Sequence, residues 1–117
     1  MKTHKDLEVW QKSIALVTIL YQLTKSFPKD EVYGLIQQVR RSGVSIPSNI
    51  AEGAARNHKT ENIQFLNIAL GSLSELETQW LISKNLGYLN TINYNSINDS
   101  LQEIRRMLIG LIKHLKS

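Results

Sequence analysis

The sequence predicts an all-α protein in which residues 1–117 form a single domain, an antiparallel up-down-up-down four-helix bundle. Four segments carry apolar residues at alternating spacings of three and four, and this spacing places them on one face of a helix. No segment shows convincing strand alternation. The connections between the four segments are short, which favours antiparallel neighbours.

The first predicted helix follows Asp6, which is a suitable capping residue, and ends near Lys25. The main stripe consists of Leu7, Trp10, Ile14, Val17 and Tyr21, and beside it runs a row of Leu16, Leu20 and Leu23. This helix is therefore apolar nearly all round, whereas a bundle buries about a third of each helix. The surplus, to which Ile109 and Ile112 add, predicts a homo-oligomer. The alternative is a lone bundle whose first helix is central and well covered.

The second helix is expected to begin after Pro28, with Asp30 and Glu31 in its first turn. Its core stripe is Ile36, Val39, Gly43, Ile46 and Ile50. Pro47 cannot donate to the carbonyl of Gly43, so we expect a kink there. The alternative is a break, with Ser45 capping a new helix. Gly43 and Gly53 predict the close approach of a neighbouring helix.

The third and fourth helices have regular stripes. The third is expected to follow Thr60 as its cap and to end at Gly87, with a stripe of Leu66, Ala69, Leu73, Leu76 and Trp80. The fourth is expected to be capped within residues 90–95, with a stripe of Ile97, Leu101, Ile104, Leu108, Leu111 and Leu115.

Composition excludes several classes of protein. There is no cysteine, which removes disulfide frameworks, thiolate metal sites and cysteine nucleophiles. The charged start MKTHKDLEVW is unlike a signal peptide, and no apolar run approaches the ~18 residues of a membrane span. We therefore expect a cytoplasmic protein without membrane contact. The net charge of +4 favours polyanionic partners.

The sequence contains no pattern that indicates catalysis. The three histidines, His4, His58 and His114, lie in separate segments, and none belongs to a Glu-x-x-His pair. Glu75 and Glu77 point to different sides of a helix, which disfavours an acid-base pair. We expect no enzymatic activity, no metal and no other cofactor.

A polar ribbon lies opposite the core stripe of the second helix. Its residues are Arg41, Ser45, Ser48, Glu52 and Arg56, flanked by Arg40 and Asn49. Such a ribbon is either a solvated helix face with a Glu52–Arg56 ion pair or a surface for a phosphate or partner subunit.

Further basic residues complete the candidate site for nucleic acid or a partner. Together with the ribbon, the candidates are Arg40, Arg41, Ser45, Ser48, Asn49, Glu52, Arg56, Lys59, Arg105 and Arg106. No aromatic platform for base stacking accompanies these charges in the sequence, because Trp10 and Trp80 fall on predicted core stripes. We therefore expect backbone contacts with little sequence preference.

Four stretches make the chain similar to a known family. These are LEVWQKSIALV, YGLIQQVRRSGVSIPSNIAEGAAR, FLNIALGSLSELETQ and RRMLIGLIKHLK, and the string VSIPSNIAEG is specific. With them the chain resembles the bacterial four-helix-bundle family named after 23S ribosomal RNA intervening sequences. The resemblance implies an up-down bundle that assembles as a homopentamer, in a family without an established molecular function. Gly43, where alanine is usual, and Ala54-Ala55 after Gly53 depart from the family pattern.

Two functional hypotheses remain open at this point. The first is a non-enzymatic oligomeric module that binds RNA, ribosomal RNA by the family resemblance, or another nucleic acid through a repeated basic surface. The second is a scaffold that recognises a protein partner, in which the positive charge serves solubility.

Overall fold

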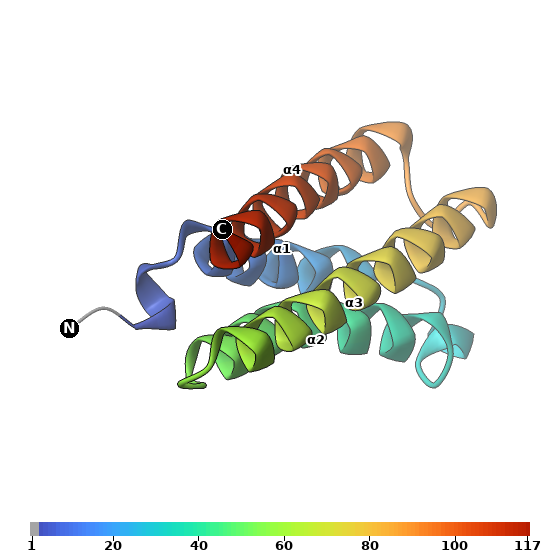
Figure 1. Cartoon of the computed structure of the whole chain (residues 1–117). Helices are drawn as coiled ribbons and strands as arrows, with labels where there is room; N and C mark the ends of the chain where they lie inside the picture. Colours follow the sequence, from blue (N-terminus) through green and yellow to red (C-terminus); the bar gives the residue numbers. More distant parts are fainter. Residues whose placement is uncertain (1–2) are drawn as a thin grey trace.

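The computed structural model describes residues 3–117, and four long helices make up most of this range (Figure 1). They are α1 (Glu8–Thr24), α2 (Leu35–Ala54), α3 (Lys59–Asn85) and α4 (Thr91–Lys116). Two short 3-10 helices, η1 (His4–Asp6) and η2 (Lys29–Glu31), precede α1 and α2. No strand occurs in the described range. The predicted all-α four-helix bundle is confirmed.

Each long helix packs against two neighbours. α1 contacts α2 and α4, and α3 contacts the same two helices, whereas the diagonal pairs make no close backbone contact within residues 3–117. The N-terminal end of α1 and the C-terminal end of α4 lie at one end of the bundle (Figure 1). The connection between α1 and α2 lies at the other end, near the connection between α3 and α4. This arrangement is the predicted up-down-up-down order.

The core stripes predicted for three helices are confirmed. All five stripe residues of α2 and all five of α3 are buried, as are Ile97, Leu101, Ile104 and Leu108 of α4. Leu111 and Leu115 are half-buried and pack against the edge of the core. Ile112, expected among the surplus apolar residues, is instead buried, whereas Ile109 is exposed as expected. The regular spacing in these helices was sufficient to identify the buried face.

The stripe predicted for α1 is wrong. The helix buries Val9, Ser13, Leu16, Leu20 and Thr24. The hydroxyls of Ser13 and Thr24 donate to the carbonyls of Val9 and Leu20, both at 2.7 Å, so these polar side chains are buried without loss of hydrogen bonding. The predicted stripe lies on the flank, where Ile14 and Tyr21 are exposed and Leu7, Trp10 and Val17 are half-buried.

Several predicted helix starts are also corrected. Leu7 precedes α1 without a side-chain cap, and Asp6 instead accepts the Thr3 N–H within η1. α2 begins at Leu35, because residues 29–31 form η2 and Gly34 is not helical. α3 begins at Lys59, so Thr60 is inside the helix.

The predicted ends near Lys25 and Gly87 and the cap of α4 agree with the structure. Gly87 has φ of +81° and donates to the Lys84 carbonyl, which ends α3. Asn90 caps α4 by accepting the Asn93 N–H.

α2 runs without a break through Pro47, so the alternative of a new helix capped by Ser45 is wrong. A kink at Pro47 stays a prediction. A Cβ on Gly43 would lie 2.9 Å from Leu20 Cδ1 of α1, and one on Gly53 would lie 2.6 Å from Asn62 Oδ1 of α3. The two glycines therefore permit the predicted close approach of neighbouring helices.

Candidate functional site

The predicted polar ribbon on α2 is divided between solvent and the α3 interface. Arg41, Ser48, Glu52 and Arg56 are exposed. The Ser45 hydroxyl is hydrogen-bonded to that of Ser72 on α3 at 2.8 Å. The Asn49 amide donates to the Ser45 carbonyl at 2.8 Å and to its hydroxyl at 2.9 Å. Ser45 therefore links α2 to α3, whereas the Asn49 amide is bound within α2.

An arginine just beyond the C-terminal end of α2 is already paired. Arg56 Nη2 lies 3.3 Å from Glu52 Oε2, which is the expected ion pair, and Arg56 Nε lies 3.9 Å from Glu61 Oε2. The guanidinium also stands 5.0 Å from the centre of the Phe65 ring. Lys59, at the start of α3, is exposed. The local charge around Arg56 is thus balanced by carboxylates.

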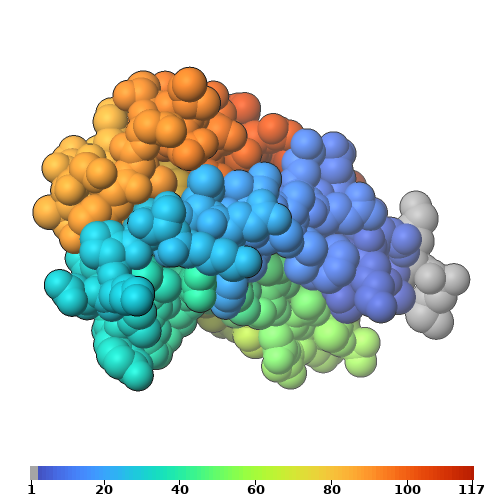
Figure 2. Space-filling view, turned by 180° about the vertical axis from the view of Figure 1, so that it is seen from behind, coloured from blue at the N-terminus to red at the C-terminus, as the bar shows by residue number. Residues whose placement is uncertain are grey.

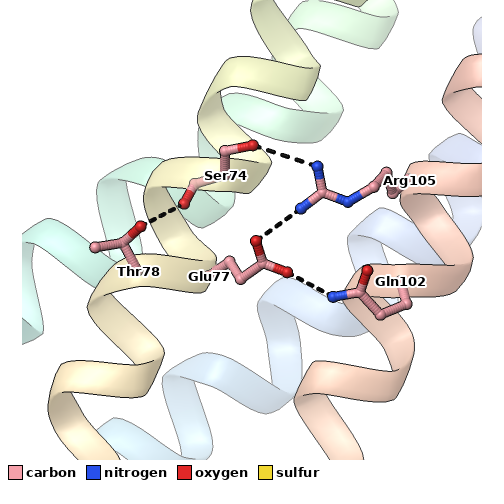
Figure 3. A network of polar contacts seen from close by, with 5 residues as sticks. All are labelled: Ser74, Glu77, Thr78, Gln102 and Arg105. Carbon is pink, nitrogen blue, oxygen red and sulfur yellow. Dashed lines mark hydrogen bonds and ion pairs between the residues drawn. The ribbon is translucent and has the colours of Figure 1, made fainter.

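Arg105 belongs to a polar network between α3 and α4 (Figure 3). Its Nη2 donates to Glu77 Oε1 at 2.8 Å and its Nη1 donates to the Ser74 hydroxyl at 3.4 Å. The Gln102 amide donates to the other oxygen of Glu77. The predicted pair of arginines is therefore split, with Arg105 holding two helices together and Arg106 exposed to solvent.

The structure does not bring the predicted basic residues into one site. Arg41 lies in the first half of α2, whereas Arg56 follows the end of this helix at Ala54, so about 20 Å of helix separates them. Arg105 and Arg106 are on α4, which makes no close backbone contact with α2.

Arg40 and Arg41 instead belong to a groove at the end of the bundle where α1 connects to α2. Its volume is about 590 Å³. It is lined by Tyr21, Thr24, Lys25, Phe27, Lys29, Val32, Tyr33, Ile36, Gln37, Arg40 and Arg41, and is called the basic groove below. In Figure 2 the cyan segment after α1 projects at this end, beside the light-blue end of α1. Four cationic side chains and no carboxylate line the groove.

Arg40 is fixed in the wall of the basic groove by α1. Its Nε donates to the Thr24 hydroxyl at 2.9 Å and its Nη2 to the Tyr21 carbonyl at 3.3 Å. The guanidinium carbon lies 4.4 Å from the centre of the Tyr21 ring. Lys25, Lys29 and Arg41 are exposed and make no ion pair with any residue of the described range. Three cations are thus available to an anion.

The acidic residues of the same connection do not line the basic groove. Glu31 Oε2 accepts the Tyr88 hydroxyl at 2.8 Å, and Glu31 Oε1 accepts the Leu35 N–H at 3.3 Å. The hydrogen bond to Glu31 raises the pKa of the Tyr88 phenol above its usual value, and the charge of Asp30 adds to this increase. Phe27, stacked on Trp80, holds the connection on the core beside Tyr88.

The expectation that no aromatic side chain accompanies the basic residues is wrong for the basic groove. Tyr33 is 91% exposed, and Tyr21 carries Arg40 on its ring. Of the two tryptophans expected in the core, Trp80 is buried but Trp10 is half-exposed. Tyr33 lies in the irregular connection before α2, so no helical spacing linked it to the cations. The available signal was the composition of residues 21–41, which combines basic and aromatic side chains.

A second groove, mainly apolar, lies between α1 and α2. Its volume is about 310 Å³, and its lining residues are His4, Trp10, Ile14, Val17, Val44, Pro47, Ser48 and Ala51. Ile14 is 41% exposed and Val44 is 39% exposed. Part of the surplus apolar surface predicted for the first helix is therefore exposed to solvent. The exposed residues, however, belong to the stripe that was expected to be buried in the core.

Residues 3–117 contain no group of three or more His, Asp or Glu side chains that could hold a metal ion. None of the helices among these residues has the length and hydropathy needed to cross a membrane.

The chain matches one protein family and is similar to a solved structure. The sequence profile of the 23S rRNA-intervening sequence protein family matches residues 5–110. The fold is similar to that of a protein of unknown function from the S23 ribosomal protein family of Bacteroides thetaiotaomicron, with a TM-score of 0.81 and 30% identity. That match covers 90% of this chain and 98% of the other. No curated protein matches the chain.

Proposed function

This chain belongs to the 23S rRNA-intervening sequence protein family, and from that premise we propose that it is a non-enzymatic module that binds RNA as a homo-oligomer. The observation that carries the proposal is the basic groove, where four cations meet without a carboxylate in the lining. RNA binding depends on such cations, because phosphate contacts release condensed counterions and supply most of the non-specific affinity. The family name indicates ribosomal RNA as the first RNA to test.

A homo-oligomer would carry several copies of the basic groove, one in each chain. The apolar groove of α1 and α2 offers exposed Ile14 and Val44 as a surface that a second copy could cover. A closed ring, a pentamer by family resemblance, would present one basic groove per chain. Weak single contacts would then add through avidity.

Native mass spectrometry of the purified protein with and without a structured ribosomal RNA fragment tests both parts of the proposal. We expect a mass of several chains of 13.4 kDa, about five by family resemblance, and RNA retention that falls steeply as salt rises. A protein that remains a single chain when concentrated would contradict the assembly.

The second candidate function is a scaffold for a protein partner, and the apolar groove favours it. The two functions differ in their salt dependence. A protein that assembles but retains no RNA at ~50 mM salt, where phosphate contacts are strong, would contradict RNA binding and support the scaffold.

A further inference from the structure

The basic groove combines two properties that phosphate binding alone does not require. Lys25, Lys29 and Arg41 come from three successive segments: the end of α1, η2 and α2. They surround a concave surface, so a ligand in the groove would meet cations from several sides. Its volume of about 590 Å³ falls within the range of roughly 300 to 1,000 Å³ that is typical of small-molecule sites.

The second property is an exposed aromatic ring that stacks on no other aromatic side chain of the described range. Tyr33 is 91% exposed, more than any other large apolar or aromatic side chain among residues 3–117. No other aromatic ring in this range stacks on it, whereas Phe27, Trp80 and Tyr88 form one cluster. An exposed aromatic ring beside cations is the arrangement that proteins use to stack a base while they hold its phosphates.

We propose that the basic groove binds an unpaired nucleotide of an RNA strand, with the base stacked on Tyr33 and the neighbouring phosphates on Lys25, Lys29 and Arg41. The inference rests on the proposed function, since it specifies which part of an RNA is recognised and where. Arg40 acts as a positioning residue, because its guanidinium is held by Thr24 and Tyr21 and fixes the wall of the groove.

An unpaired strand fits this arrangement better than a duplex. In an A-form helix the bases are stacked on each other and the wide minor groove displays mainly 2′-hydroxyls, so no base face is free for Tyr33. A loop, a bulge or a strand end can turn one base outward. The phosphates of a duplex could contact the cations, but none of its bases could stack on Tyr33.

The test uses the full chain and a labelled RNA of about 12 nucleotides without self-complementarity, alone and annealed to its complement. Fluorescence anisotropy at ~50 mM salt measures both affinities. The variants are Tyr33→Ala and Tyr33→Phe. Ile92→Ala is the matched control, because Ile92 at the start of α4 is 79% exposed and outside the basic groove. These exposed side chains can be changed without unfolding the bundle.

We expect Tyr33→Ala to weaken single-strand binding by about 5- to 100-fold, the usual loss for one stacked base. Tyr33→Phe and Ile92→Ala should keep the wild-type affinity, and duplex binding should change less than about twofold in every variant. Equal single-strand affinities for Tyr33→Ala and Ile92→Ala would contradict base stacking on Tyr33. The proposed binding of RNA through its phosphates would be unaffected by that result. Wild-type protein that binds neither strand nor duplex would overturn the proposed function as well.

A polyglutamate peptide as competitor separates a nucleotide site from a general anion site. Unlabelled RNA is the reference competitor, and both competitors are compared by their concentration of negative charges. If the peptide displaces the labelled single strand only at a much higher concentration than unlabelled RNA does, the nucleotide assignment is supported. If it competes equally well, the basic groove recognises negative charge alone and the inference is wrong.

Discussion

Arg105 and Arg41 both project from the surface of the bundle, but only Arg105 faces a carboxylate. Arg105 is bound by Glu77 and Ser74, and Arg56 likewise lies beside Glu52 and Glu61. At the end of the bundle where α1 meets α2, Arg41 and its lysine neighbours have no acidic partner in the lining of the basic groove. A count of basic residues is therefore a poor guide to an anion site, because the availability of each cation depends on which carboxylates the fold places beside it.

Charge reversal in the basic groove should have the largest effect on RNA binding. We expect Lys29→Glu with Arg41→Glu to weaken binding on the order of 30-fold at low salt, since two attractive contacts become repulsive. Filter binding measures the loss, and circular dichroism checks the fold. Reversal of Lys113 and Lys116, exposed at the other end of the bundle, is the matched control. An equal loss in the control would mean that net charge alone governs binding.

Disruption of the apolar groove should rank second. Ile14→Lys adds a positive charge, yet we expect about a 10-fold loss of RNA affinity. The proposed homo-oligomer should dissociate into single chains, which lose the avidity of several basic grooves. Light scattering should show smaller particles at unchanged helicity. Ile68→Lys is a matched control, because Ile68 on α3 is exposed and lines neither the apolar groove nor the basic groove. A variant that stays assembled would refute the role assigned to Ile14.

Release of Glu31 should have a smaller effect. Tyr88→Phe removes the hydroxyl that holds Glu31 Oε2, so the carboxylate can approach the cations of the connection. We expect about a twofold loss of RNA affinity from this partial neutralisation. In the wild type, spectrophotometric titration should show that Tyr88 ionises at higher pH than a free tyrosine, because its pKa is raised. A Tyr88 whose pKa is not raised would contradict the hydrogen bond.

Removal of a paired arginine should have the smallest effect on RNA. We expect Arg105→Ala to leave RNA affinity within about twofold of the wild type and to lower the free energy of unfolding by roughly 0.5 to 1 kcal/mol, the range of a partly exposed ion pair. Urea denaturation measures the stability. A large loss of RNA affinity without a loss of stability would place Arg105 in the binding surface.

The fold could be predicted from the sequence where one apolar row per helix stands out. This was so for α2, α3 and α4. In α1 two rows have the same spacing, and Ser13 and Thr24 conceal the buried one, because the sequence does not reveal that their hydroxyls are satisfied by the carbonyls one turn earlier.

The candidate site could be predicted only in part, for a related reason. Helical spacing correctly aligned Arg41, Ser48 and Glu52 on the exposed face of α2, whereas Arg56, also exposed, lies just beyond the end of the helix. It gave no information about the connection before α2, which folds back so that Lys25, Lys29 and Tyr33 meet Arg41. The path of that connection depends on tertiary contacts, above all Phe27 on Trp80 and Glu31 with Tyr88.

The salt dependence of RNA binding tests the central claim most directly. The logarithm of the binding constant should be measured against the logarithm of the salt concentration for the wild type, for Lys29→Ala with Arg41→Ala, and for Arg105→Ala. We expect the magnitude of the slope to fall by about 1.4 for a single-stranded RNA in the double variant, roughly 0.7 for each of the two lost phosphate contacts, and the slope of Arg105→Ala to equal the wild type. Identical slopes for all three proteins would contradict the assignment of RNA binding to the basic groove.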